Sequence, residues 1–308
     1  MRNYDLAIAY RIYPKVAKLA MGLPAGDDKL RFSELCLRSF KEALGDLRVK
    51  LWVLLDGCPE EYADLFLKYF EAQDLEFIRL PGIGNQATFG RQIDILLGQE
   101  GSNLVYFAED DYVYLPGQFE RMLRFLRSGR EVDFVTPYDH PDCYELDLHR
   151  EPKRMAVFEG HHWRTAASTC LTFLTRKSTL ARYERTLRTY SLGNNDCAMW
   201  LSLTKRRLFH PLLTLKFLIR GEFYWKVILK AWLYGWRQNL FGATARLWVP
   251  VPGLATHACA GLMSPAVDWI SVMRSHLGQS INEEPHAQAA GNACAEIIPE
   301  IDVSLSRS

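Results

Sequence analysis

The chain has 308 residues, of which 48% are hydrophobic and 24% charged, an ordinary composition for a globular protein with a sizeable core. Its 37 basic residues nearly balance its 36 acidic ones, so the overall charge gives no reason to expect a nucleic-acid partner. The seven cysteines are scattered and form no Cys-x-x-Cys pair, which argues against a disulfide framework or a zinc site. No signal-peptide pattern or long uncharged apolar run occurs, so we expect a cytoplasmic protein without a transmembrane helix.

Apolar runs and helical periodicity alternate along the first 136 residues. Apolar stretches predict strands at residues 6–10, 49–55, 75–80, 104–108 and 132–136. Apolar residues at helical spacing predict helices at 30–44, 60–72, 87–97 and 118–128. This alternation predicts an α/β fold with a mixed, mostly parallel sheet flanked by helices.

The pattern changes after residue 137. Residues 137–165 look loop-rich, a strand is predicted at 169–174, and another is predicted at 247–251. A helix should open at residues 193–196, because Asn and Asp cap helix starts well. The polar end from 279 to 308 is expected to be a poorly ordered tail.

Three consecutive carboxylates are the most informative feature of the chain. Glu109, Asp110 and Asp111 directly follow an apolar strand, and in a closed site they would repel one another and lose hydration. A divalent cation would offset that cost, and oxygen ligands suit Mg²⁺ or Mn²⁺. From position alone, a solvated turn or pairing with arginine explains the three acids equally well.

Other polar residues also stand at predicted strand ends. Tyr10 and Arg11 end the first strand, and Asp56 ends the second. Because ligands of such sheets bind beyond the carboxyl ends of the strands, these side chains and the acidic triplet should converge on one crevice.

These residues, taken in order, resemble the motifs of nucleotide-sugar-dependent glycosyltransferases of the GT-A fold, especially the family-two-like group. The resemblance covers about residues 4 to 260. Glu109-Asp110-Asp111 is similar to the metal-binding DXD motif, and Asp56 to the strand-end acid that contacts the nucleotide base. Asn194-Asn195-Asp196 is similar to the xED element that holds the catalytic base, and His257 to a late histidine of the metal shell.

The resemblance implies a GT-A, Rossmann-like architecture and a role for each matching residue. Residues 1–136 would bind the nucleotide sugar, and residues 137–278, including a helical aromatic and basic extension at 207–241, would bind the acceptor. The donor would be a nucleoside diphosphate sugar, with UDP types favoured, and the cofactor would be Mn²⁺ or Mg²⁺. The implied residues are Asp196 as catalytic base; Tyr10, Arg11, Asp56, Arg91, Glu109 and Asp110 for the donor; Asp111 and His257 for the metal; and His161, His162 and Trp163 for the acceptor.

The sequence departs from the family pattern at three positions. Leu55 stands where a second Asp is usual, Asn195 where Glu is common, and Gln92 follows Arg91 where Asn is usual. These departures affect the inferred substrate more than the inferred fold.

Each candidate also has an ordinary structural explanation. Asp196 alone would be a plain helix cap, and His257 alone an ordinary buried or surface histidine. Arg91 fits a simple surface residue on a polar helix face, and residues 161–163 fit a packed loop. The ordered combination favours function for Asp196 and His257.

Residues 207–241 crowd aromatic, apolar and basic side chains together. Such a composition suits the surface of a membrane, and it equally suits a helical pair that packs on the catalytic domain or between subunits. The resemblance implies a metal-dependent, inverting glycosyltransferase that acts on a saccharide or lipid-linked acceptor in bacterial surface-glycan synthesis. The composition of 207–241 is compatible with a peripheral place on the inner face of a membrane. The alternatives are a nucleotidyltransferase or a non-catalytic membrane-docking scaffold of the same fold.

Overall fold

The computed structural model describes residues 3–15, 28–129, 131–221 and 223–278. The tail predicted at 279–308 lies outside these residues. The strands are β1 (Leu6–Ile12), β2 (Val49–Asp56), β3 (Leu75–Leu80), β4 (Leu104–Glu109), β5 (Tyr112–Tyr114), β6 (Phe134–Val135), β7 (Met155–Phe158), β8 (His161–Ala166), β9 (Phe173–Arg176), β10 (Leu247–Val251) and β11 (Ala255–His257).

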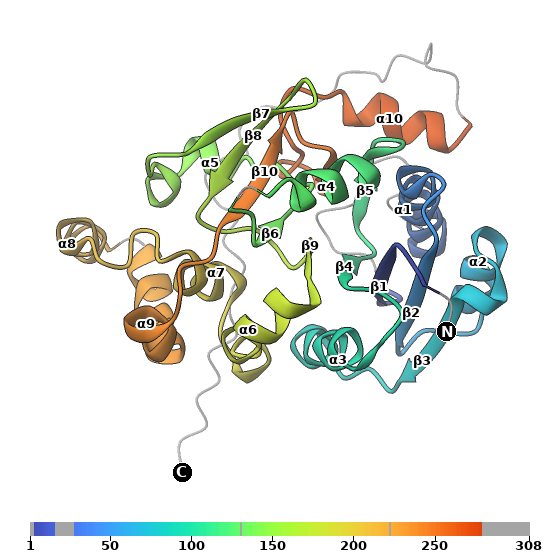
Figure 1. Ribbon diagram of the computed structural model, residues 1–308, viewed down its shortest axis with the longest axis horizontal. Coiled ribbons are helices and arrows are strands. Elements are labelled where there is room, and N and C mark those ends of the chain that lie inside the picture. The colour runs from blue at the N-terminus through green and yellow to red at the C-terminus, as the bar shows by residue number, and fades with distance from the viewer. Residues whose placement is uncertain (1–2, 16–27, 130, 222, 279–308) are drawn as a thin grey trace.

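Helices connect and cover these strands (Figure 1). The α-helices are α1 (Lys29–Leu44), α2 (Glu61–Tyr69), α3 (Asn85–Gly98), α4 (Gln118–Arg127), α5 (Asp142–Glu145), α6 (Lys177–Leu187), α7 (Asp196–Thr204), α8 (Pro211–Ile219), α9 (Tyr224–Phe241) and α10 (Trp269–His276). The short 3₁₀ helices are η2 (Ala72–Asp74), η3 (Asp147–His149) and η4 (Tyr190–Leu192).

The main sheet of the described chain has the strand order β3-β2-β1-β4-β9-β6-β10-β8-β7. The four strands from β3 to β4 pair in parallel. Beyond them only β9 and β8 run against the common direction, so seven of the nine strands point the same way. The predicted α/β fold with a mixed, mostly parallel sheet is confirmed.

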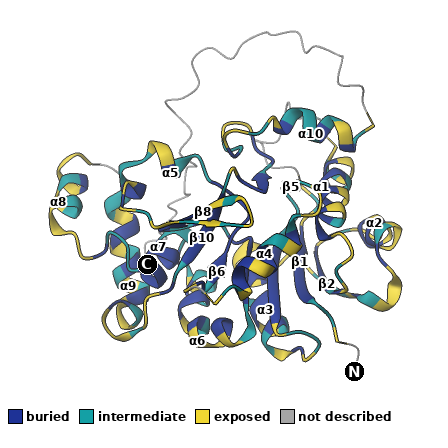
Figure 2. Cartoon of the chain, turned by 45° about the horizontal axis from the view of Figure 1, so that its top comes forward, coloured by how far each residue is buried: buried dark blue, intermediate teal, exposed yellow. Residues whose placement is uncertain are grey.

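The sheet separates two apolar cores because side chains alternate along each strand. In β1, Leu6, Ile8 and Tyr10 pack toward α1 and α2, whereas Ala7 and Ala9 pack toward α3. Figure 1 shows α1 and α3 on opposite sides of these strands, and Figure 2 shows the strands themselves as buried.

The order of the strands places a crevice between β1 and β4. The chain winds outward from β1 to β3 and then returns through α3 to β4, on the other side of β1. The connections after β1 and after β3 therefore leave in opposite directions. In open α/β sheets, ligands bind at such a reversal, outside the carboxyl ends of the strands.

The second half of the chain differs from the sequence prediction. Residues 137–165, expected to be loop-rich, contain the antiparallel hairpin of β7 and β8, and the strand expected at 169–174 is β9, at Phe173–Arg176. The helix α6 of this half was not predicted, and neither was the short strand β5 of the first half. The strands here are short: β6 is buried at both residues, β9 is buried at its first three, and β7 alternates only between exposed and half-buried residues, so the period-2 pattern is weak.

Two helices of this half pack unusually closely. A Cβ on Gly235 of α9 would lie 2.2 Å from Oγ of Ser202 in α7, so only glycine permits this approach. The Ser202 hydroxyl in turn donates to the carbonyl of Ala231 at 3.1 Å. The close contact fixes α9 against the protein along one face.

Candidate active site

A cleft of about 460 Å³ lies at the carboxyl ends of β1, β2 and β4. Its walls come from the strand ends, the glycine-rich loop before α3, the start of α1 and the segment after β11. The predicted residues among its lining are Arg11, Asp56, Glu109, Asp110, Asp111 and His257. Residues from four distant parts of the sequence therefore meet where the sheet topology predicts a ligand site.

Asp111 and His257 form the centre of this cleft. The short sheet of β5 and β11 places His257 opposite Tyr112, and its Nε2 lies 2.9 Å from Oδ2 of Asp111. Although burial favours the neutral imidazole, the Asp111 carboxylate raises the pKa of His257 well above its usual value. Burial would raise the pKa of Asp111, but His257 lowers it below the usual value.

This pair fits a divalent cation. The second carboxylate oxygen of Asp111, Oδ1, is buried and has no hydrogen-bond partner, and a buried polar atom of this kind usually has a partner. A carboxylate oxygen is a suitable ligand for Mn²⁺, and the His257 imidazole would join it on releasing its proton, as metal binding requires of a histidine ligand. Among the described residues, no group of three or more His, Cys, Asp or Glu side chains gathers as a metal site, so further ligands would have to come from substrate or water.

Asp110 is paired with a lysine that the sequence analysis did not select. Nζ of Lys29 lies 2.5 Å from Oδ2 of Asp110, and the backbone N–H of Tyr13 donates to the same oxygen at 3.3 Å. Burial raises the pKa of Asp110 in spite of Lys29. Lys29 is the first residue of α1, where a positive charge opposes the helix dipole, and that unfavourable placement was an available sequence signal.

Glu109 and Arg11 brace the two strand ends against each other. Arg11 forms an ion pair with Glu109 and donates to the carbonyl of Asn85 at 2.9 Å. The other carboxylate oxygen of Glu109 accepts from the hydroxyl of Thr172 at 2.9 Å. Arg11 is only 6% exposed, and Glu109 raises its pKa against the effect of burial. Both oxygens of Glu109 are thus used within the protein.

Asp56 holds the glycine-rich loop in place. Its two carboxylate oxygens accept from the backbone N–H groups of Ile83 at 2.7 Å and Gly84 at 2.8 Å. Gly84 has a φ of 83°, a conformation that favours glycine. Asp56 lines the cleft, and both of its oxygens are already engaged by the loop.

Asp196 begins α7, as the sequence predicted. Asn195 is the cap, and its side chain accepts from the N–H of Ala198 at 2.7 Å. Burial raises the pKa of Asp196, against the effect of a hydrogen bond from the N–H of Cys197, and the charges of Glu109 and Arg11 also act on it. Asp196 is not among the residues that line the cleft. It lies half-buried at the start of α7, where the charges of Arg11 and Glu109 still influence its pKa.

Two predicted donor residues lie elsewhere. The side chain of Tyr10 is 1% exposed and packs edge-on against Phe40 and Phe66 in the core. Arg91 is exposed on α3 and pairs with Asp94 at 3.7 Å. Neither lines the cleft, because strand alternation turns Tyr10 toward the core and the helical period turns Arg91 toward solvent.

Gln92, the neighbour of Arg91, points inward instead. Its amide nitrogen donates to the carbonyl of Ala9 at 2.7 Å and to that of Ala108 at 3.1 Å. These carbonyls belong to β1 and β4, so Gln92 ties together the two strands that flank the crevice. Sequence reasoning treated Gln92 only as a departure from a family pattern and missed this role.

The predicted acceptor residues belong to β8, far along the sheet order from β1 and β4. Trp163 is fully buried and stacks on Phe125 with ring centroids 4.0 Å apart. His161 lies with its Nε2 3.1 Å from the carbonyl oxygen of Pro252, and His162 pairs with Val251 in the sheet. None of the three lines the cleft, and Trp163 is a core residue.

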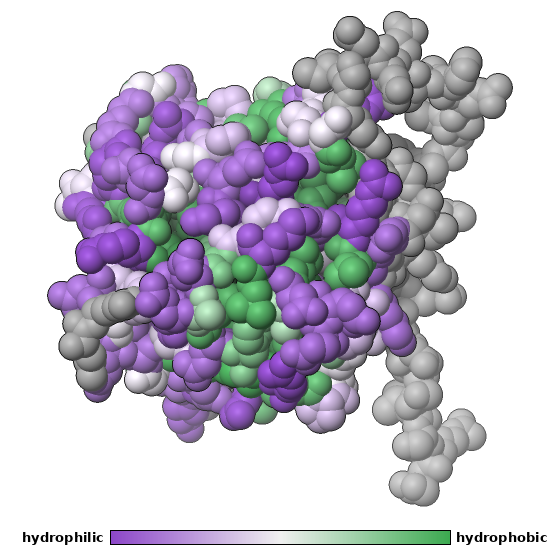
Figure 3. All heavy atoms as spheres, turned by 90° about the vertical axis from the view of Figure 1, so that its right-hand side faces the viewer, coloured by the Kyte–Doolittle hydropathy of each residue, from purple (hydrophilic) through white to green (hydrophobic). Residues whose placement is uncertain are grey.

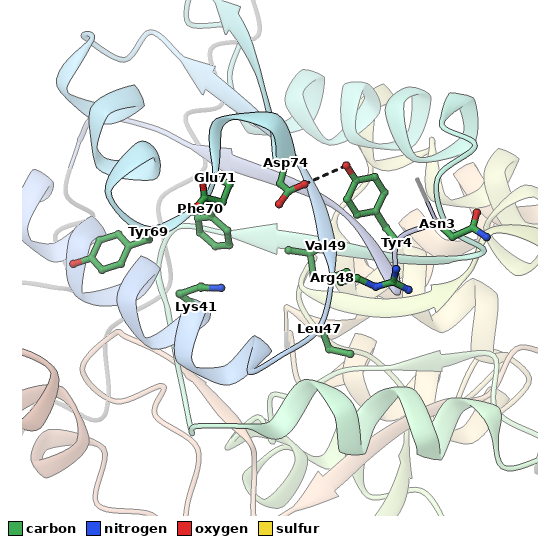
Figure 4. A pocket seen from close by; sticks show the side chains of 10 residues that line it. All are labelled: Asn3, Tyr4, Lys41, Leu47, Arg48, Val49, Tyr69, Phe70, Glu71 and Asp74. Carbon is green, nitrogen blue, oxygen red and sulfur yellow. Dashed lines mark hydrogen bonds between the residues drawn. The ribbon is translucent and has the colours of Figure 1, made fainter. Parts of the chain in front are cut away.

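A second groove, of about 610 Å³, lies at the opposite ends of the strands, around the starts of β1 and β2 (Figure 4). It is the larger of the two, but its polar groups pair locally: the Tyr4 hydroxyl donates to Asp74 at 3.2 Å, and the Lys41 ammonium lies 5.3 Å from the Phe70 ring centre. It contains no close pair of carboxylate and imidazole like that of the cleft. We therefore assign the candidate site to the smaller cleft.

No protein-family model matches the chain, and no curated protein matches its sequence. Among solved structures it is similar to S. aureus TarS in complex with UDP (12% identity, TM-score 0.42, 64% of this chain and 54% of that chain). It is also similar to the mannosyltransferase PcManGT from Pyrobaculum calidifontis in complex with GDP-Man and Mn²⁺ (12% identity, TM-score 0.36, 58% of this chain and 46% of that chain).

A third similar structure is glucosyl-3-phosphoglycerate synthase from Mycobacterium tuberculosis in complex with Mn²⁺, UDP and phosphoglyceric acid (13% identity, TM-score 0.34, 58% of this chain and 58% of that chain). In each comparison the chain spans only about half the length of the similar protein. PcManGT is by name a glycosyltransferase, the class whose motifs this sequence resembles. At these identities and TM-scores the likeness identifies no activity for this chain.

Proposed function

We propose that this protein is a metal-dependent, inverting glycosyltransferase that takes a sugar from a nucleoside diphosphate donor of the UDP type. The single observation that carries the proposal is the pairing of Asp111 with His257 in a cleft at the topological reversal between β1 and β4. The volume of about 460 Å³ suits a small ligand. Lys29 and Arg11 line the same cleft. Each is paired with a carboxylate of the acidic triplet and would contact a diphosphate by exchanging that partner for a phosphate oxygen.

The roles of the cleft residues follow from their contacts. Asp111 and His257 would hold Mn²⁺ or Mg²⁺, which as a Lewis acid would stabilise negative charge on the leaving diphosphate. Asp56 keeps the glycine-rich loop in position, and Arg11, Glu109 and Gln92 fix the ends of β1 and β4.

We assign the role of general base to Asp196. In an inverting transfer the acceptor hydroxyl attacks the anomeric carbon from the side opposite the diphosphate. Its oxygen forms the new bond, its proton passes to the Asp196 carboxylate, and the electron pair of the broken bond leaves with the diphosphate. A helix start alone would make Asp196 a weak base, and burial counters this by raising its pKa.

The acceptor class rests on the motif resemblance. A saccharide or lipid-linked acceptor in bacterial surface-glycan synthesis is consistent with it. A nucleotidyltransferase is disfavoured, because these enzymes usually carry a glycine-rich basic signature after the first strand, and this chain has Tyr10-Arg11-Ile12-Tyr13-Pro14 there. A non-catalytic scaffold of the same fold would not bind a nucleotide in a metal-dependent way.

The proposal is tested by thermal unfolding with a panel of nucleoside diphosphates, each with Mn²⁺, Mg²⁺ or a chelator. A ligand that binds only the folded protein at a hundredfold excess over its Kd stabilises it by about 2.7 kcal/mol. We expect a metal-dependent rise in Tm with UDP, and its loss in Asp111→Asn.

Asp46→Asn is the matched control, because Asp46 is exposed on the loop after α1. This variant should keep the full response to UDP and metal. If well-folded wild-type protein shows no shift with any nucleotide and metal, the glycosyltransferase proposal fails and the scaffold is favoured.

A further inference from the structure

The helix α9 has apolar side chains on two opposite faces. One face is buried against the protein through Val227, Ile228, Ala231, Gly235 and Asn239. The other exposes Leu229, Leu233, Trp236 and Leu240, which are 45% to 67% exposed. The spacing of these four residues follows the helical period, so they form one continuous stripe. We call them the α9 stripe.

The neighbouring helix α8 repeats this feature. Leu212, Leu215 and Ile219 follow helical spacing and are 50% to 75% exposed. Figure 1 shows α8 and α9 together at one end of the molecule. Figure 3 shows a different side, the right-hand side of Figure 1, where hydrophilic residues cover much of the visible surface and apolar ones lie among them. Exposed apolar side chains in such number usually mark a surface that another body covers.

Positive charge accompanies the α9 stripe. Lys226 and Arg237 lie beside it on the helix and are exposed. The Arg237 guanidinium lies 5.0 Å from the Trp236 ring centre, and the Lys226 ammonium lies 5.9 Å from that of Trp225. The sequence from 205 to 241 holds eight Lys and Arg residues against one acid, Glu222, although the whole chain is nearly neutral.

Aromatic and basic side chains beside an apolar stripe form the pattern of a helix that lies in a membrane interface. The long basic side chains reach the phosphate level while their stems follow the apolar surface. Among the described helices none has both the length and the apolarity needed to cross a bilayer. If one face of α9 contacts the membrane surface while the other packs against α7, the helix does not need to cross the bilayer.

We propose that the α9 stripe, with α8 beside it, docks this protein on the surface of a membrane that contains anionic lipids. The excess of basic over acidic residues selects this occupant over a second copy of the chain, because two copies would bring like charges together. The proposal concerns a surface outside the cleft and stands independently of the reaction proposed above.

The test is sedimentation of the full chain with vesicles of phosphatidylcholine alone or mixed with phosphatidylglycerol, without nucleotide or metal. We expect binding to the mixed vesicles and little binding to the neutral ones. Leu229→Gln with Leu233→Gln should abolish it. Lys226→Gln with Arg237→Gln should weaken it about five-fold for each charge removed, and added salt should weaken wild-type binding.

The matched controls are Leu67→Gln on α2 and Arg127→Gln on α4, both exposed and remote in sequence. They should bind vesicles like the wild type. Wild-type protein that ignores anionic vesicles, or α9 variants that still bind them fully, would overturn the proposal. So would α9 variants that only convert a dimer to a monomer in sedimentation velocity, since the stripe would then lie between two copies.

Nucleotide binding by the same α9 variants keeps the two proposals separate. Their response to UDP and metal should equal that of the wild type, because the cleft is untouched. Vesicle binding without any nucleotide response would leave the membrane surface supported and the glycosyltransferase proposal without support.

Discussion

The two halves of the main sheet follow different rules. From β3 to β4 the strands are parallel, and β1 and β4 are buried along nearly their whole length. From β9 to β7 the strands include short antiparallel ones of two to six residues. The first half was predicted well. In the second half β10 was predicted at its observed bounds, but β9 was placed too early and β7, β8 and α6 were not predicted. The comparison shows that long apolar strands can be recognised in the sequence, whereas the short strands β6, β7 and β9 carry too few residues for a clear pattern.

The candidate site lies where the halves meet. Four of the residues that line the cleft, Arg11, Asp56, Asp110 and Asp111, come from the first half. From the second half, His257 lines the cleft and Thr172 donates to Glu109. If the halves have separate roles in donor binding and acceptor activation, variants in each should fail in different ways.

The largest expected effect is that of Asp196→Asn. Under the proposed function it should lower kcat by about a hundredfold to ten-thousandfold, the usual range for loss of a general base. Donor binding, measured by calorimetry with UDP and Mn²⁺, should be kept. An equal loss of donor binding and of kcat would contradict a separate role for the second half.

The pH dependence should follow the same carboxylate. Because burial raises the pKa of Asp196, the base is protonated at a higher pH than an ordinary aspartate, and kcat/KM should fall as the pH drops through that raised pKa. A pH–rate profile with no acidic fall above the ordinary aspartate range would argue against Asp196 as the base.

The same carboxylate should make the protein less stable as the pH rises, although it makes the enzyme more active. The folded state keeps the Asp196 proton to a higher pH than the unfolded chain does, so it binds more protons in that interval, and the free energy of unfolding falls as the pH rises through it. Asp196→Asn should therefore raise Tm at neutral pH while it removes activity. A lower Tm in this variant would mean that the charged carboxylate stabilises the fold.

In the second half, Gly235→Ala should destabilise the protein by about 1–3 kcal/mol, because the new Cβ would overlap Ser202. Gly98→Ala at the end of α3 is the control, since a Cβ there meets no atom within 4 Å, and it should be neutral or stabilising by up to about 1 kcal/mol. Urea unfolding of both variants measures the difference. Equal stabilities would show that α7 and α9 can move apart freely.

In the first half, Gln92→Leu should cost about 1–2 kcal/mol, because two buried carbonyls of β1 and β4 lose their donor. The cost is moderated because the unpartnered Oε1 of Gln92 disappears as well. The same unfolding measurement, with UDP binding alongside, tests whether this tie also keeps the cleft in shape. Unchanged stability would mean that other contacts hold the two strands.

The smallest effect is expected for Arg91→Ala. The side chain is exposed and its pair with Asp94 is a surface contact, so stability should change by less than about 0.5 kcal/mol. UDP binding should also be unchanged. Weaker binding would restore the role that the motif resemblance gave to Arg91 and would imply that α3 turns when the donor binds.

The sequence by itself determined the elements whose residues repeat at a regular period. It identified the strands of the first half, α1 within one residue and the start of α7 at Asp196. It also marked Asp56 and the acidic triplet as strand-end candidates, because apolar runs that end in polar residues are visible locally. His257 was selected only by its place in the motif order.

Only the tertiary structure decided which side chains meet. Tyr10 and Arg11 are adjacent in sequence, yet strand alternation buries one in the core and turns the other to the cleft. On α3, Arg91 is likewise exposed to solvent, whereas its neighbour Gln92 is buried between β1 and β4. The three acids of the triplet contact residues that lie 63 to 146 positions away in the sequence. Glu109 contacts Thr172, Asp110 contacts Lys29, and Asp111 contacts His257. Such contacts depend on how the sheet is wound, and no local pattern in the chain contains that information.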